Sequence, residues 1–180
     1  GMPMAILGMP EDTEVAVLEM GMNHFREIAY LSEIANPDVA VIINIGTMHI
    51  EHLGSMEGIL KAKLEILEGT KPDASVIFNG DDQLLWNYRT ESEREITYFG
   101  EENAHAAVRA VNVDEEENLL RFRAVIGEES VPVELTLDGR HYVSDALAAI
   151  AVGNALGVSL EDAAHSLAAF QNMAGRQEIF

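Results

Sequence analysis

Short apolar runs alternate with segments of helical spacing over the first hundred residues. Residues 14–21 (EVAVLEMG), 38–46 (DVAVIINIG) and 74–82 (ASVIFNGDD) are rich in β-branched and apolar side chains, so each predicts a buried strand. A further strand is predicted over residues 95–100 (EITYFG). Strands of this kind that alternate with helices are typical of parallel βαβ units.

The segments between these strands predict helices. Residues 26–37 place apolar side chains at helical spacing and stop at Asn36-Pro37. The side chains expected to face inward are Ile28, Leu31, Ile34 and Ala35. A second helix is predicted over residues 55–68, ended by Gly69, and a short third one over residues 82–89.

The pattern changes after residue 104. Residues 105–137 give three alternating segments joined by acidic or Gly-containing turns, which predict antiparallel strands. From Ser144 onward the chain is predicted to be helical, with Ser159 as the N-cap of the last helix. The predicted fold class is therefore α/β, a parallel sheet flanked by helices with a small antiparallel β-section.

Composition limits the possible partners of this domain. The 180 residues include 31 acids and 11 bases, and the formal net charge of −20 argues against nucleic-acid binding. An acidic protein that handles a phosphate ligand needs a divalent cation or a local positive cluster. No cysteine is present, and the longest apolar helical candidate has about 11 residues, so neither a thiolate metal site nor a membrane span is expected.

Polar side chains follow the predicted parallel strands at their carboxyl ends, where open parallel sheets bind ligands. Glu19 ends the first strand, His49 follows the second, and Asn79, Asp81 and Asp82 follow the third. Together they could hold a hard divalent cation and the phosphates that it carries. Each also has an ordinary interpretation: a solvated acid, a structural histidine, and a common turn sequence.

Lys63 lies within the apolar stripe of the helix predicted over residues 55–68. Its stem could snorkel and leave the amine at the edge of the core, and the pattern alone favours this reading. Alternatively, burial would lower the pKa of the amine. A neutral amine can react with carbon dioxide to form a carbamate, an anion able to bind a metal.

A set of motifs resembles the central domain of the Mur ligases. They are E-x-G-x-N-x-x-x-E-I, N-x-G-x-x-H-x-E-x-x-G-S, K-A-K-x-E-I, F-N-G-D-D, G-R-H, A-L-A-A and a final G-R, in family order over nearly the whole chain. The details are most similar to the members that add D-alanyl-D-alanine to a UDP-N-acetylmuramoyl-tripeptide. The resemblance implies a P-loop-NTPase-like sheet, an ATP-dependent reaction through an acyl phosphate, and a cytoplasmic enzyme of peptidoglycan precursor synthesis.

The resemblance also implies roles for individual residues. Glu19 and His49 would be magnesium ligands, and Lys63 would be carbamylated and join them, so that Lys63 and His49 serve catalysis. The residues implied to bind ATP are Asn79, Asp82, His141 and Arg176. Two residues depart from the family pattern, because Tyr142 and Asp145 stand where asparagines are usual.

No G-x-x-x-x-G-K-[ST] phosphate loop occurs in the 180 residues. We therefore expect a fragment, truncated at its N-terminus, that does not itself catalyse ligation. Residues 1–176 would be part of the central domain and residues 177–180 the start of a linker. The missing sheet segment would expose a strand edge and favour self-association. Two alternatives stay open: another Mur ligase or a folylpolyglutamate-synthase-like ligase, and a non-catalytic binding domain.

Overall fold

The computed structural model describes residues 1–48 and 50–170. The helices that precede or separate the first strands are α1 (Met2–Leu7), α2 (Glu27–Ala35), α3 (Ile50–Leu53), α4 (Met56–Leu64), α5 (Ile66–Gly69) and α6 (Gln83–Tyr88). The strands are β1 (Val39–Ile42), β2 (Ser75–Asn79), β3 (Ile96–Gly100), β4 (Val108–Glu116), β5 (Leu119–Ile126) and β6 (Glu129–Leu135). Helices α7 (His141–Ala155) and α8 (Leu160–Ala168) follow the last strand.

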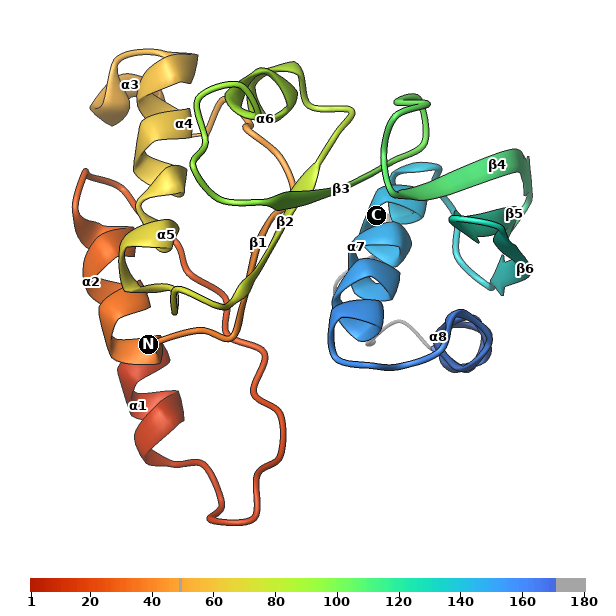
Figure 1. Cartoon of the computed structure of the whole chain (residues 1–180), viewed down its shortest axis with the longest axis horizontal. Coiled ribbons are helices and arrows are strands. Elements are labelled where there is room, and N and C mark those ends of the chain that lie inside the picture. The colour runs from red at the N-terminus through yellow and green to blue at the C-terminus, as the bar shows by residue number, and fades with distance from the viewer. Residues whose placement is uncertain (49, 171–180) are drawn as a thin grey trace.

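The six strands form one mixed sheet in the order β1-β2-β3-β4-β5-β6 (Figure 1). Strands β1 to β4 pair in parallel, and β4, β5 and β6 pair antiparallel. The predicted fold class, a parallel sheet with a small antiparallel section, is confirmed. The antiparallel strands continue the parallel sheet instead of forming a separate unit.

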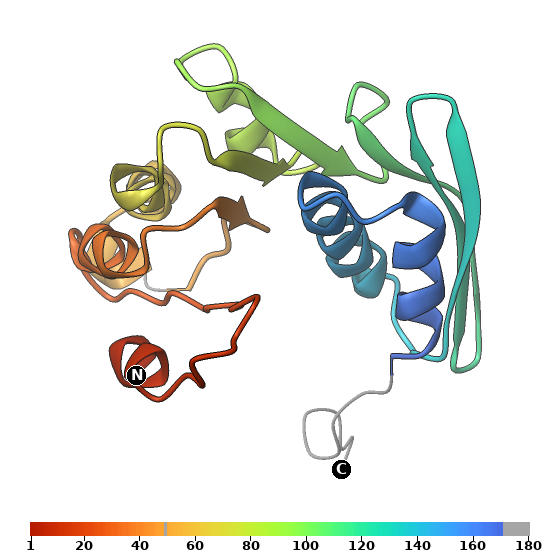
Figure 2. The same ribbon diagram turned by 60° about the horizontal axis from the view of Figure 1, so that its bottom comes forward.

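Strand β2 separates two hydrophobic cores because its side chains point alternately to opposite faces of the sheet. Val76 and Phe78 are buried in one core with residues of α2, α4 and α6. Ile77 is buried in the other core with residues of α7, α8 and the strands β4 to β6. Figure 2 shows α7 and α8 gathered on one side of the sheet, beneath β3 to β6. The parallel part therefore has helices on both faces, as buried parallel strands require.

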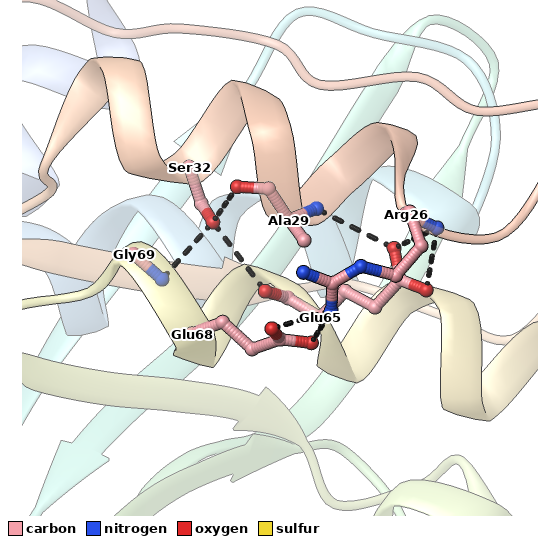
Figure 3. A network of polar contacts seen from close by, with 6 residues as sticks. All are labelled: Arg26, Ala29, Ser32, Glu65, Glu68 and Gly69. Atoms are coloured by element: carbon pink, nitrogen blue, oxygen red, sulfur yellow. Dashed lines mark hydrogen bonds and ion pairs between the residues drawn. The ribbon is translucent and has the colours of Figure 1, made fainter.

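Helices α2 and α5 approach each other closely at Ser32 and Gly69. Ser32 is fully buried, and its hydroxyl oxygen accepts a hydrogen bond from the Gly69 N–H at 3.2 Å (Figure 3). A Cβ atom on Gly69 would lie 2.1 Å from the carbonyl carbon of Ser32. The short side chain at one position and the missing side chain at the other permit this contact.

Helix α6 carries the single tryptophan of the chain, Trp86. The Trp86 ring meets the Tyr98 ring edge-on at 4.9 Å between centroids, and the guanidinium of Arg89 lies 4.3 Å from the indole centroid. The Tyr98 hydroxyl donates to the Leu85 carbonyl at 3.1 Å, and burial raises the pKa of Tyr98 to about 12. These contacts fix α6 against β3.

Three expectations from the sequence are wrong. The helix expected over residues 55–68 is divided at Glu65 into α4 and α5. Residues 14–21 form no strand, and Val15 and Val17 are 65% and 93% exposed. A strand needs a partner for its backbone groups, and none of the described strands pairs with this segment. In α2, Ile34 is exposed instead of buried, because the face turned toward α5 is the one that carries Ser32.

The outer edge of β1 pairs with no strand among residues 1–48 and 50–170. Self-association through this edge stays a prediction. Across the same residues, none of the helices combines the length and the apolar character that crossing a membrane requires.

We expect Gly69→Ala to lower the free energy of unfolding by about 1–3 kcal/mol, because the added methyl group overlaps the backbone of α2. Gly153→Ala, inside α7, is the matched control, because the atom nearest to its added Cβ would be the Cβ of Val158, at 3.6 Å. This control should be neutral or stabilising by up to about 1 kcal/mol. Urea unfolding of both variants measures the difference, and equal stabilities would contradict the close contact.

Candidate functional site

Polar side chains gather at the carboxyl ends of β1 and β2. These ends lie side by side because the two strands are parallel and pair from Val39 with Ser75 to Ile42 with Phe78. Asn44 follows β1, Asn79 ends β2, and Asp82 precedes α6. We call Asn44, Lys63, Asn79 and Asp82 the strand-end cluster.

Asp82 ties the segment after β1 to the start of α6. Its Oδ2 atom accepts a hydrogen bond from the Ile45 N–H at 2.6 Å. Its Oδ1 atom accepts from the N–H groups of Leu84 at 3.0 Å and Leu85 at 3.2 Å. The second pair is an N-cap, which satisfies backbone donors that a helix start leaves without partners. One carboxylate therefore holds two chain segments in fixed relation.

Lys63 reaches the strand-end cluster from α4. Its Nζ atom donates to the carbonyl oxygen of Asn44 at 2.6 Å and lies 3.3 Å from the Asn44 Oδ1 atom. Burial lowers the pKa of Lys63, and the negative charge of Asp82 opposes this shift. The Lys63 side chain is partly buried, and its amine is hydrogen-bonded to the exposed Asn44, two residues after β1.

The other residues after β2 organise loops. The Asn79 side chain accepts from the Asp81 N–H at 2.8 Å, and its amide donates to the Ser144 hydroxyl at 3.3 Å. The Asp81 carboxylate accepts hydrogen bonds from three consecutive N–H groups after β3, those of Glu101, Glu102 and Asn103. Asn79 therefore links the end of β2 to α7, and Asp81 shapes the loop that follows β3.

The first turn of α7 adds further polar groups. His141 begins the helix, and its ring lies 4.2 Å from the Tyr142 ring between centroids. Partial desolvation raises the pKa of the Asp145 carboxyl, and the positive charge of His141 opposes this shift. Arg140 forms an ion pair with Glu101 from the loop after β3. The contact between Asn79 and Ser144 connects this turn to the strand-end cluster.

The remaining predicted site residues are not brought together by the described part of the chain. Glu19 lies in the extended segment before α2, and its side chain is exposed. His49 and Arg176 lie outside the described residues. Within residues 1–48 and 50–170, no group of three His, Cys, Asp or Glu side chains is arranged to hold a metal ion. The predicted metal site with Glu19, His49 and Lys63 stays a prediction.

Two hollows lie away from the strand-end cluster. One, of about 400 Å³, lies between α2 and α4–α5 and is lined by Phe25, Arg26, Lys61, Leu64, Glu65 and Glu68. Another, of about 240 Å³, is lined by Thr47, Ile50, Glu51 and His52. Neither is lined by a member of the strand-end cluster.

Sequence reasoning missed two residues of this region. Asn44 supplies both acceptors for the Lys63 amine, and the signal for it was its place as the first residue of the N-x-G-x-x-H motif. Glu65 is buried at 7% exposure although it is acidic. Its position two residues after Lys63 in the K-A-K-x-E-I motif was visible, but its partners lie 36 and 39 residues away in the chain.

Comparison with known proteins supplies a family for this arrangement. A family model of the Mur ligase middle domain matches residues 1–153. The chain is 41% identical over 180 residues to the UDP-N-acetylmuramoyl-tripeptide–D-alanyl-D-alanine ligase of Bacillus subtilis. That match covers 99% of this chain but 38% of the relative, so the chain spans well under half of the relative's length.

Solved structures agree with the sequence matches. MurF from Acinetobacter baumannii superposes with a TM-score of 0.89 at 35% identity, over 97% of this chain and 38% of that one. MurF from Thermotoga maritima, solved in complex with ADP, superposes with a TM-score of 0.84 at 28% identity. That match covers 98% of this chain and 40% of that one. The fold described above is therefore that of the corresponding part of these proteins.

We expect Asp82→Asn to lower the free energy of unfolding by about 1–2 kcal/mol, because an amide cannot accept at both of the positions that now face backbone N–H groups. Asp73→Asn, at an exposed position, is the matched control and should leave stability unchanged. Urea unfolding measures both, and amide exchange at Ile45 should quicken only in Asp82→Asn. Unchanged exchange at Ile45 would contradict the role of Asp82.

Proposed function

Because the chain belongs to the Mur ligase family, whose middle domain it carries, we propose that it is part of the ATP-binding domain of a D-alanyl-D-alanine-adding ligase. In that reaction ATP phosphorylates the carboxylate of a UDP-N-acetylmuramoyl-tripeptide. The amine of D-alanyl-D-alanine then attacks the acyl phosphate and releases phosphate. The 41% identity to a relative with this activity supports the choice of substrate within the family.

The observation that carries the proposal is the placement of Lys63. Its amine is half-buried at the carboxyl end of β1, with a pKa lowered by burial, and it faces the acceptors of Asn44. A lowered pKa increases the fraction of neutral amine, which is the form that reacts with carbon dioxide. The product would be a carbamate on Nζ, formed with loss of one proton.

Lys63 could take part in binding a magnesium ion only once its amine is modified. An amine that carries a proton cannot bind a cation, whereas a carbamate offers oxygen atoms, the ligands that magnesium prefers. We propose that carbamylated Lys63, Glu19 and His49 would hold the ion. Magnesium, when bound, would neutralise charge on the phosphate oxygens of ATP. Asp82 would stay in its structural bonds and add negative charge beside Lys63.

We propose that the nucleotide approaches the same side of the sheet, near Asn79, Asp82, His141 and Arg176. The link from Asn79 to Ser144 supports this grouping, because it joins the end of β2 to the first turn of α7. The ADP complex of a MurF neighbour supports ATP as the nucleotide. Tyr142 and Asp145 would give this chain a more aromatic and more acidic base site than an asparagine pair.

The domain limits, the location and the partners of the whole protein are inferred from its family alone. We propose residues 1–176 as central domain, residues 177–180 as the start of a linker, and a cytoplasmic location for the whole protein. The partners would be the two small-molecule substrates, with no role for nucleic acid or a membrane. A non-catalytic binding domain is the rival function, because the chain departs from the family pattern at Tyr142 and Asp145.

We expect the isolated 180-residue chain to bind magnesium-ATP weakly or not at all and not to hydrolyse it. The physical reason is that its sequence contains no G-x-x-x-x-G-K-[ST] segment to surround the phosphates, in a chain of net charge −20. Isothermal titration with magnesium-ATP tests this expectation. A clear dissociation constant in the micromolar range would contradict it.

In the full-length protein, we expect Lys63→Ala to reduce ligase activity by about 100-fold, as expected for the loss of a metal-site ligand. Added acetate or formate should restore part of the activity by supplying the missing carboxylate. Lys61→Ala, two residues earlier on the same helix, is the matched control and should retain activity. Full activity of Lys63→Ala would refute the proposed role of Lys63.

A further inference from the structure

We infer that Glu65 is a positioning residue that holds Lys63 at the end of β1 by fixing the junction of α4 and α5 against α2. The inference rests on the proposed function of Lys63, which gives the position of its amine a purpose. It concerns a residue that touches neither a substrate nor the strand-end cluster.

Glu65 acts as the N-cap of a helix to which it does not belong. Helix α2 has no side-chain cap of its own, and Arg26 precedes it with a left-handed φ of 74°. Both carboxylate oxygens of Glu65 lie 2.8 Å from the Arg26 N–H, and Oε2 lies 3.4 Å from the Ala29 N–H (Figure 3). The buried carboxylate therefore satisfies donors that the start of α2 would otherwise leave without partners.

The backbone around Glu65 is tied to the same helix. The Ser32 hydroxyl lies 2.9 Å from the Ala29 carbonyl and 3.4 Å from the Glu65 carbonyl, so one donor is shared between α2 and the junction. Gly69, at the end of α5, donates to the Ser32 oxygen at 3.2 Å. As Figure 3 shows, the junction is held through its carboxylate, its carbonyl and the helix that follows.

Lys63 and Glu65 point to different sides of this segment. Two residues correspond to about 200° around an α-helix, and Glu65 follows α4 with helical dihedral angles, so the two side chains point in nearly opposite directions. Glu65 reaches α2, and Lys63 reaches the Asn44 carbonyl after β1. A rotation of the junction that releases one contact moves the other side chain as well.

The carboxylate at position 65 indicates that this side chain orients the α4–α5 junction and does not merely fill space. An apolar side chain would fill the same space without the free-energy cost of burying a charge. A carboxylate with paired backbone donors gives instead one defined rotation of the helix. The nearby pair of Arg26 and Glu68 lies at the surface and contributes little to this constraint.

The test measures how readily Lys63 reacts, which requires neither ATP nor magnesium. The whole protein is treated with a limiting amine-acetylating reagent at about pH 11, where the Lys63 amine is mostly neutral whether it is held or released. Mass spectrometry then gives the acetylation of Lys63 relative to Lys71, which reports the accessibility of the amine and not its pKa. Glu65→Gln should raise this ratio about three- to tenfold, because the amine is no longer held on the Asn44 carbonyl. Glu68→Gln, which loses only the surface pair with Arg26, is the matched control and should leave the ratio unchanged.

Two further variants keep the inference falsifiable. Glu65→Asp retains the charge, but its side chain is one methylene group shorter, so the carboxylate is displaced from the donors of α2. A raised acetylation ratio in this variant would show that Lys63 depends on the position of the carboxylate and not on its charge. Ser32→Ala removes the hydroxyl near the Glu65 carbonyl and should raise the acetylation ratio by a smaller factor. This variant provides the test if both Glu65 variants fail to fold. An unchanged ratio in a folded Glu65→Asp protein with faster amide exchange at Ala29 would overturn the inference.

The outcome for Glu65 and the outcome for the proposed function are separable. Full activity of Lys63→Ala would refute the function and leave the acetylation result standing. An unchanged ratio in Glu65→Asp together with an inactive Lys63→Ala protein would refute only the positioning role.

Discussion

Acids outnumber bases by 31 to 11 in this chain, so a carboxylate near the core has to find most of its hydrogen-bond donors on the backbone. The buried Glu65 and the partly buried Asp82 follow this constraint, and the exposed Asp81 is bound in the same way. Each accepts from backbone N–H groups of a segment distant in sequence: the start of α2, the loop after β3 and the residues after β1. These carboxylates fix helix starts and loop positions, and the arrangement of the strand ends depends on them.

Lys63 has unusual surroundings for a lysine in so acidic a chain. Its first contact is a carbonyl oxygen, not a carboxylate, and the charge of Asp82 acts on it without a direct bond between them. An amine in a close ion pair would stay protonated, because an opposite charge favours the charged form. An amine that faces a neutral acceptor in a half-buried position keeps a larger neutral fraction, which suits the reaction with carbon dioxide that we propose.

Local pattern predicted what depends on local contacts. The apolar runs of β1 and β2, the start of a helix at residue 55 and the Ser159 cap follow from neighbouring residues, and all four appear in the structure. Residues 15–18 (VAVL) form an apolar run like that of β1 (VAVI), but strand formation also needs a pairing partner, which composition does not reveal. The role of Glu65 depends on Arg26 and Ala29, so only the assembled fold could identify it.

The single tryptophan lies where Asp82 fixes α6. Trp86 contacts Tyr98 and Arg89, and the helix that carries it begins at the N-cap that also binds the Ile45 N–H. A displacement of the residues after β1 would change the position of Trp86 through the Asp82 carboxylate. With no second tryptophan in the 180 residues, tryptophan fluorescence from this chain, excited where its four tyrosines do not absorb, reports on a single site. The chain thus contains its own optical probe of the region where we place the chemistry.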